Sequence, residues 1–267
     1  MMKSKITYIL VATAVFAVAS FLFLDRDGSL TGGHGHGVDT LIARNVEARG
    51  GADAWRAVSS LRLEGRMDLG QGMHVPYTIE QQRPGRMCLE FEFDGELATQ
   101  CVADGAGWKR LPYRGQQDYQ AMNADELRDI ADAASIDGLL FDSAQRGFDI
   151  RQVGQESLEG RDAIKLEVTM PSGGKRWVYL DAETALEVKV DAVRMLRGKG
   201  HLVETWYHEW QETDGLLIPR RQITQTEGMP ESNFLTIDTV VVNPPMAYDR
   251  FRIPVVATGN GAGGNPS

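Results

Sequence analysis

The sequence predicts a mainly β protein with a few helices, built on one curved antiparallel sheet with a continuous apolar face. Two observations support this: apolar and polar residues alternate through most of the chain, and short turn motifs separate the alternating segments. The clearest segment covers residues 61–69, where Leu61, Leu63 and Met67 alternate with charged side chains. A period of two is typical of a half-buried strand. The apolar face is therefore the first candidate for a functional surface.

Twelve segments carry this alternation, and turns such as Arg83-Pro84-Gly85, Asp94-Gly95 and Gly173-Gly174 separate them. The predicted strands cover residues 61–69, 73–82, 86–93, 96–103, 107–111, 148–155, 161–170, 175–181, 186–196, 202–212, 216–227 and 232–243. A twisted sheet of this size curls. We therefore expect an incomplete, half-open β-barrel.

Two helices are expected in front of the strands. Asp39 or Thr40 caps the first, which ends at Gly50-Gly51, and the second covers residues 52–58. A third helical stretch, from Asn123 to about residue 135, interrupts the strands and begins with a capping-box pattern. We expect these helices to act as lid or plug over the concave face.

The lid is predicted to cover the concave face with apolar side chains and to open by a hinge near Asp137-Gly138. Its covering residues are Leu127, Ile130, Leu139, Leu140 and Phe141.

The concave face itself is predicted to form a lipid cavity, although the pattern equally allows a solid core. Methionines recur there and adapt to flexible ligands. The expected lining residues are Leu61, Leu63, Met67, Met87, Leu89, Phe91, Phe93, Ile164, Leu166, Val168 and Met170. Trp206 and Trp210 form an aromatic stripe on one predicted strand face, suited to the core, to the cavity or to a membrane interface.

The N-terminus predicts export. Residues 1–24 form a signal anchor or a signal peptide, because lysines precede an apolar run from Ile6 to Leu24 that is long enough to span a bilayer. Ala17-Val18-Ala19 supplies a cleavage pattern, so both readings stay open. Residues 25–37 are a Gly/His-rich linker, residues 38–254 the folded domain, and residues 255–267 a disordered tail.

Composition excludes several functions. The net charge of −9 and the pI near 5.1 argue against a nucleic-acid partner. Motifs for nucleotide binding, metal-dependent hydrolysis and nucleophilic catalysis are missing from the sequence. We therefore expect no enzyme activity, no cofactor and no metal site.

Cys88 and Cys101 are predicted to form a cross-strand disulfide. If Asp94-Gly95 is a two-residue hairpin loop, Phe93 lies opposite Glu96, and counting outward places Cys88 opposite Cys101. The pair falls on a non-hydrogen-bonded rung, where Cα atoms lie about 4.5 Å apart. That spacing suits a disulfide, which an exported domain can form.

Several short motifs follow the order found in a known superfamily. They are Ile42-Ala43-Arg44-Asn45-Val46-Glu47-Ala48-Arg49-Gly50-Gly51, Leu61-Arg62-Leu63-Glu64-Gly65, Ile136-Asp137-Gly138-Leu139-Leu140, Gly160-Arg161-Asp162-Ala163-Ile164-Lys165-Leu166, Val178-Tyr179-Leu180-Asp181, Asp214-Gly215-Leu216-Leu217-Ile218-Pro219 and Val242-Asn243-Pro244-Pro245. On these residues the chain from about 38 to 254 resembles outer-membrane lipoprotein-sorting proteins of the LolA/LolB-like superfamily. The resemblance implies a half-open barrel whose hydrophobic cavity, closed by lid helices, carries acyl chains of lipids or lipoproteins across the periplasm.

We therefore expect a periplasmic carrier of lipid or lipoprotein acyl chains between inner and outer membrane. It would be tethered by its N-terminal helix to the inner membrane of a Gram-negative-type cell, with an inner-membrane exporter as a possible partner. Cleavage would instead leave a soluble periplasmic protein. Two alternatives stay open: an inner-membrane-anchored, lipid-sensing regulatory module, and an accessory subunit of an envelope complex that binds no ligand.

Overall fold

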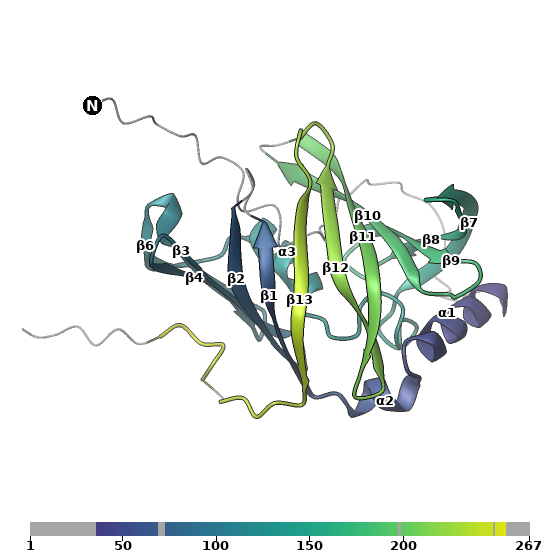
Figure 1. Ribbon diagram of the computed structural model, residues 1–267, viewed down its shortest axis with the longest axis horizontal. Helices are drawn as coiled ribbons and strands as arrows, with labels where there is room; N and C mark the ends of the chain where they lie inside the picture. Colours follow the sequence, from purple (N-terminus) through teal and green to yellow (C-terminus); the bar gives the residue numbers. More distant parts are fainter. Residues whose placement is uncertain (1–35, 69–72, 197–198, 248, 255–267) are drawn as a thin grey trace, which may run out of the picture.

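The computed structural model describes residues 36–68, 73–196, 199–247 and 249–254. These residues form one antiparallel sheet of thirteen strands with three α-helices and a short 3-10 turn (Figure 1). The elements are α1 His36–Ala48, α2 Ala52–Ala57, β1 Ser60–Asp68, β2 His74–Gln82, β3 Arg86–Phe93, β4 Glu96–Ala103, β5 Ala106–Leu111, η1 Pro112–Arg114, β6 Gln116–Ala121, α3 Ala124–Ala133, β7 Asp149–Leu158, β8 Arg161–Thr169, β9 Lys175–Asp181, β10 Glu187–Leu196, β11 Lys199–Thr213, β12 Leu216–Thr226 and β13 Asn233–Val242.

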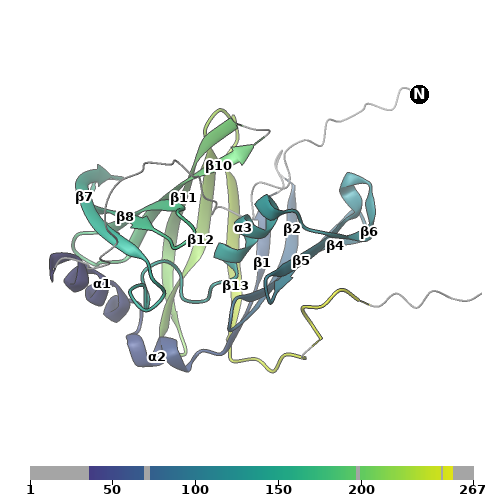
Figure 2. The ribbon, with the colours of Figure 1, turned by 180° about the vertical axis from the view of Figure 1, so that it is seen from behind.

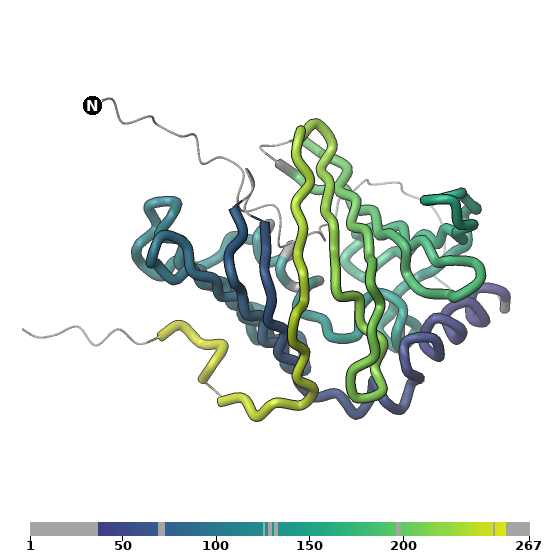
Figure 3. The backbone as a smooth tube through the Cα atoms, viewed as in Figure 1, coloured from purple at the N-terminus to yellow at the C-terminus, as the bar shows by residue number. Residues whose placement is uncertain are grey.

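The sheet consists of two meanders that meet in its middle. The strand order is β6-β5-β4-β3-β2-β1-β13-β12-β11-β10-β9-β8-β7, so the first and last strands of the chain are neighbours. Figure 3 shows this meeting as the blue and yellow tubes that run side by side. The sheet edges are β6 and β7, and the sheet is therefore curved but open, as predicted.

The connection between the two edge strands crosses the sheet. It contains α3 and the turns of residues 134–148, and it passes over the concave face (Figure 2). Asn123 and Glu126 begin α3 with reciprocal hydrogen bonds, each 3.0 Å long, between the side chain of one and the backbone N–H of the other. This arrangement confirms the predicted capping box.

Apolar side chains beneath this connection form three clusters. The first lies between α3 and strands β1 to β5, and it includes Met87, Leu89 and Ile130. The second joins α1 and Leu140 to strands β7 to β10. The third joins α2 to β1 and β12 around Trp55. The concave face is thus divided among three packed regions.

The convex face carries the disulfide. Cys88 lies opposite Cys101 with a Cα–Cα distance of 4.1 Å, which confirms both the predicted register and the predicted bond. The chain after β13 packs on this face, where Phe251 is buried against the two cysteines and its carbonyl oxygen accepts a 2.9 Å hydrogen bond from Trp108 Nε1. Arg250 anchors the same segment through an ion pair with Glu90 at 2.7 Å.

One strand was not predicted from the sequence, and two predicted boundaries were wrong. The strand β6 was missed because its residues are mostly exposed at a sheet edge, so they carry no apolar alternation. The strand β11 begins at Lys199 instead of 202, since polar residues near a hairpin tip pair without an apolar pattern. The helix α1 begins at His36, inside the predicted linker.

The predicted signal segment and tail lie outside the described residues, as does most of the linker. None of the helices in the described part of the chain has the length and apolar character needed to cross a membrane.

Gly65 permits the junction of the two meanders. A bulge separates Glu64 from Gly65 in the pairing of β1 with β13, and a Cβ at Gly65 would lie 1.9 Å from the carbonyl oxygen of Thr236. We expect Gly65→Ala to lower the free energy of unfolding by about 1–3 kcal/mol, because the strands must move apart. Urea denaturation measures this loss.

The matched control is Gly154→Ala, since Gly154 also lies at a bulge but has no atom within 4 Å of an added Cβ. We expect this variant to differ from the wild type by less than about 0.5 kcal/mol. Equal stability of Gly65→Ala and the wild type would show that the junction tolerates a wider spacing.

The disulfide is expected to stabilise the domain through the loop it closes. Its cysteines lie 13 positions apart in the sequence, and a loop of about this length contributes roughly 3 kcal/mol in the chain-entropy account. A Cys88→Ala, Cys101→Ala double variant should therefore unfold at lower urea concentration. An unchanged midpoint would mean that the strand register alone holds this hairpin.

Candidate functional site

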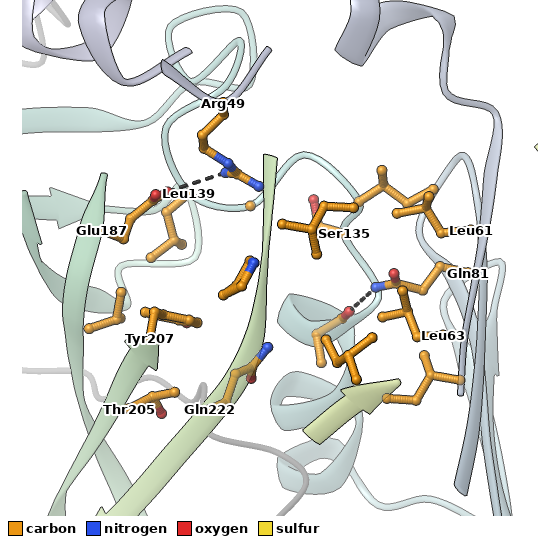
Figure 4. Close-up of a pocket in the computed structure, with 18 of the residues that line it drawn as sticks. Arg49, Leu61, Leu63, Gln81, Ser135, Leu139, Glu187, Thr205, Tyr207 and Gln222 are labelled. Carbon is orange, nitrogen blue, oxygen red and sulfur yellow. Dashed lines mark hydrogen bonds and ion pairs between the residues drawn. The ribbon is translucent and has the colours of Figure 1, made fainter. Parts of the chain in front are cut away.

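A cavity of about 270 Å³ lies where the three apolar clusters meet beneath the crossing connection. Figure 4 shows side chains converging on it from the sheet, from the turn after α1 and from the connection. Its lining residues are Arg49, Trp55, Leu61, Leu63, Ile79, Gln81, Met87, Ala133, Ser135, Ile136, Gly138, Leu139, Leu140, Val178, Glu187, Val190, Thr205, Tyr207, Trp210, Ile218, Pro219, Gln222, Thr224, Leu235 and Ile237.

One wall of the cavity is apolar. It consists of alternate residues on four adjacent strands, because side chains two apart point to the same face. Leu61 and Leu63 come from β1, Ile79 from β2 and Met87 from β3, while Leu235 and Ile237 come from β13. This wall can bury an acyl chain without any hydrogen bond.

The opposite wall is polar. In Figure 4 the labelled side chains of Arg49, Glu187, Tyr207 and Thr205 follow one another down the side facing Leu61 and Leu63, with Gln222 beside Thr205. Arg49 comes from the turn that follows α1, and the others come from strands β10, β11 and β12. The cavity is therefore amphipathic: Leu61 and Leu63 lie on one side together with Gln81, and the charged pair of Arg49 and Glu187 lies on the other side together with Leu139.

An ion pair lies at one end of the polar wall. Arg49 Nη1 is 3.2 Å from Glu187 Oε1, and the side chains are only 14% and 12% exposed. The guanidinium carbon lies 4.5 Å from the centre of the Trp55 ring and 5.9 Å from that of Trp210. The Arg49 carbonyl oxygen accepts hydrogen bonds from Trp55 Nε1 and from the Leu217 backbone, both 3.0 Å long, which fixes the residue where α1 ends.

Tyr207 remains an uncharged hydroxyl on this wall. Burial is the main cause that raises its pKa above the ordinary value, and the negative charge of Glu187 raises it further, while Arg49 opposes both. The phenol therefore stays protonated throughout the physiological pH range and can donate a hydrogen bond.

The cover over the cavity is tied to the sheet by polar contacts. Gln81 Nε2 donates a 2.7 Å hydrogen bond to the Ala133 carbonyl at the end of α3. Arg83, in the turn after β2, forms an ion pair with Asp137. Arg146 donates to the carbonyl of Gly138 at 2.6 Å and to Ser135 Oγ at 3.2 Å. The predicted hinge residues are thus held by arginine side chains: Asp137 pairs with Arg83, and the Gly138 carbonyl accepts from Arg146.

Some of the residues predicted to line a lipid cavity lie at the cavity of the structure, and others do not. Leu61, Leu63 and Met87 line the cavity, and the predicted lid residues Leu139 and Leu140 lie above it. The other predicted residues lie outside this lining: Met67, Leu89, Phe91, Phe93, Leu127 and Ile130 pack in the first cluster, Ile164, Leu166 and Val168 in the second, Phe141 in the third, and Met170 is buried elsewhere. The reason is that the cover packs against both ends of the concave face, whereas this cavity lies between them.

The polar wall was not predicted. Glu187 and Thr205 lie in strands that the alternation predicted. A single polar residue on an apolar strand face does not, however, indicate that the residue lines a cavity. Trp206 and Trp210 were expected on one strand face, but Trp210 lines the cavity while Trp206 lies 5.3 Å from the Lys189 amine. Glu209, with a φ of 57°, reverses the alternation between them.

The side chains around the cavity show no known catalytic arrangement. Its lining contains neither histidine nor cysteine, so the described residues offer no imidazole or thiol there. Within the described ranges, no group of three or more His, Cys, Asp or Glu side chains is placed to share a metal ion.

Comparisons with known proteins identify the fold. No protein-family model and no curated protein sequence matches this chain. Solved structures do match it, and three of them cover 80% of this chain each. A DUF1329 family protein from Desulfovibrio piger has 11% identity and a TM-score of 0.55, with 96% of its own chain covered.

The other two structures carry names that agree with the resemblance seen in the sequence. A putative outer membrane lipoprotein-sorting protein domain from Vibrio parahaemolyticus has 11% identity and a TM-score of 0.53, with 94% of its chain covered. A LolA superfamily protein from Nitrosomonas europaea has 12% identity and a TM-score of 0.55, with 96% covered. At these identities the comparison establishes the fold alone: this chain has the same half-open, curved antiparallel sheet as these three structures.

Arg146 is expected to hold the cover closed. Replacing it by methionine removes the donors to Gly138 and Ser135, and hydrogen bonds from a charged group contribute about 1.5–3 kcal/mol. Backbone amides of residues 135–148 should then exchange with deuterium about 10-fold faster or more, while the strands keep their protection. Hydrogen–deuterium exchange with mass spectrometry measures both.

Arg151→Met serves as the control, because Arg151 is exposed on β7 and pairs with Asp149 and Glu167 on the sheet. Unchanged exchange at residues 135–148 in Arg146→Met would mean that apolar packing alone fixes the cover.

Proposed function

We propose that this protein binds an acyl chain of a lipid or lipoprotein in the central cavity and carries it between the membranes of the cell envelope. The observation that supports this most strongly is the cavity itself, which has one wall of aliphatic side chains and lies beneath a separate covering segment. A solid core would leave no such space between the sheet and its cover.

The size of the cavity favours one chain at a time. Ligand pockets in proteins commonly measure about 300–1,000 Å³, and this cavity of about 270 Å³ lies just below that range. Each buried methylene contributes about 0.8 kcal/mol, so a single medium-length chain can bind without polar recognition. Larger lipids would require the cover to move away from the sheet.

The proposed compartment is the periplasm, with the apolar N-terminal segment as a tether to the inner membrane. The disulfide of Cys88 and Cys101 supports this proposal, since such bonds persist in oxidising compartments. The fold supports it too, because one similar structure is described as an outer membrane lipoprotein-sorting domain. An inner-membrane exporter is the partner we propose for loading.

We further propose that the protein acts by binding and not by catalysis. The charged residues of the cavity, Arg49 and Glu187, neutralise each other instead of activating a nucleophile. Their role in this account is recognition of the ligand.

Filling the cavity is expected to abolish binding. Leu63 lies on the apolar wall, and Leu63→Trp places an indole in the space that an acyl chain would occupy. The full-length protein, stripped of lipid, should bind the uncharged probe N-dodecyl dansylamide saturably, whereas the variant should bind it at least about 10-fold more weakly. Dansyl fluorescence titration measures both affinities.

Val153→Trp is the matched control, because Val153 is 49% exposed on the edge strand β7. It should bind the probe as the wild type does, and circular dichroism checks that both variants fold. If the wild type takes up no probe saturably, the carrier proposal fails and an accessory role without ligand replaces it.

A further inference from the structure

The polar wall of the cavity contains three buried atoms that form no hydrogen bond with any described residue: Arg49 Nε, Glu187 Oε2 and Thr205 Oγ1. All three residues line the cavity, and Thr205 is only 3% exposed. A buried polar atom without a partner costs about 1–3 kcal/mol, so each of these three atoms would be stabilised by a ligand that supplies a hydrogen-bond partner. Three of them along one wall indicate a ligand with polar atoms of its own.

The chemistry of these atoms defines what can meet them. Arg49 Nε donates a hydrogen bond, Glu187 Oε2 accepts one, and the Thr205 hydroxyl does either. Tyr207 lies between Glu187 and Thr205 on the same wall and adds a hydroxyl (Figure 4). A matching ligand therefore carries several oxygens, at least one of which bears a hydrogen.

The charges of the wall define the charge of the ligand. Arg49 Nη1 lies 3.2 Å from Glu187 Oε1, and the two side chains together contribute no net charge. An anionic head group would approach the Glu187 carboxylate in a site of low polarity, where like charges repel strongly. A cationic head group would meet Arg49 in the same way. The pair therefore favours an uncharged head group.

We propose that the cavity selects a single-chain lipid with an uncharged, hydroxyl-bearing head group, such as a glyceryl ester. The head group lies along Arg49, Glu187 and Thr205, and the acyl chain lies against Leu61, Leu63 and Met87. This inference rests on the proposed function and specifies its ligand class. It excludes free fatty-acid anions from the same site.

Two ligands of equal chain length test the proposal. We expect 1-monododecanoylglycerol to bind the delipidated full-length protein about 10-fold more tightly than dodecanoate, or more, in calorimetric titration at pH 7.5 below the critical micelle concentrations. Equal affinities would overturn the inference, as would tighter binding of dodecanoate.

Glu187→Gln tests the role of charge. The substitution keeps the size of the side chain but leaves Arg49 with a net positive charge, so dodecanoate should bind about 10-fold more tightly or better than it does to the wild type. Glu167→Gln is the matched control, because Glu167 pairs with Lys175 away from the cavity lining. Unchanged dodecanoate binding in Glu187→Gln would contradict the charge argument.

Thr205→Val tests recognition independently of the ion pair, and it covers the case in which Glu187→Gln fails to fold. Loss of one hydrogen bond should lower the binding affinity for 1-monododecanoylglycerol about 2- to 12-fold and leave the affinity for dodecanoate unchanged. The melting temperature of the ligand-free variant should not fall, because a buried hydroxyl without a partner is removed. If Thr205 had only a structural role, Thr205→Val would instead lower the melting temperature and leave the affinity for 1-monododecanoylglycerol unchanged.

The outcomes separate this inference from the proposed function. Saturable binding of N-dodecyl dansylamide without discrimination between the two dodecanoyl ligands would overturn the head-group inference alone. Failure of all three ligands to bind would overturn both.

Discussion

The pairing of β13 with β1 is the constraint on which the rest of the structure depends. Because the first and last strands meet in the middle of the sheet, β6 and β7 become its two edges, and the segment that joins them has to cross the sheet. The connecting segment crosses on the concave side because that face is apolar. Burial of an apolar face is the main stabilising contribution available to the domain. A covering segment over an apolar face is therefore a consequence of strand order.

The cavity follows from the way this cover is packed. The helix α3 fills the side over β1 to β5, and the turns around Leu140 fill the side over β7 to β10. Between them the cover touches the sheet through polar contacts, such as that of Gln81 with Ala133, which hold it in place without filling the space. The buried pair of Arg49 and Glu187 faces this space, and aromatic rings around Arg49 limit its access to water. A space with aliphatic side chains on one side and a charged pair on the other is what an amphipathic ligand requires.

Local patterns predicted most of the fold, and only part of the site. Alternation located twelve strands, and the two-residue turn at Asp94-Gly95 fixed the register that joins Cys88 to Cys101. The cavity depends on which parts of the concave face the cover leaves empty, and periodicity does not contain that information: Leu63 and Phe91 have the same pattern, yet only Leu63 lines the space. The pairing of Arg49 with Glu187 joins residues 138 positions apart and has no local signal.

The central claim is that the cavity holds one lipid in the living cell. Native mass spectrometry of the full-length protein, extracted gently from cell envelopes, tests it most directly when combined with lipid extraction of the same sample. The account predicts a population carrying a single bound lipid of one-chain mass, which the Leu63→Trp variant lacks. A spectrum that shows only ligand-free protein, or an equal lipid load on Leu63→Trp, would contradict it.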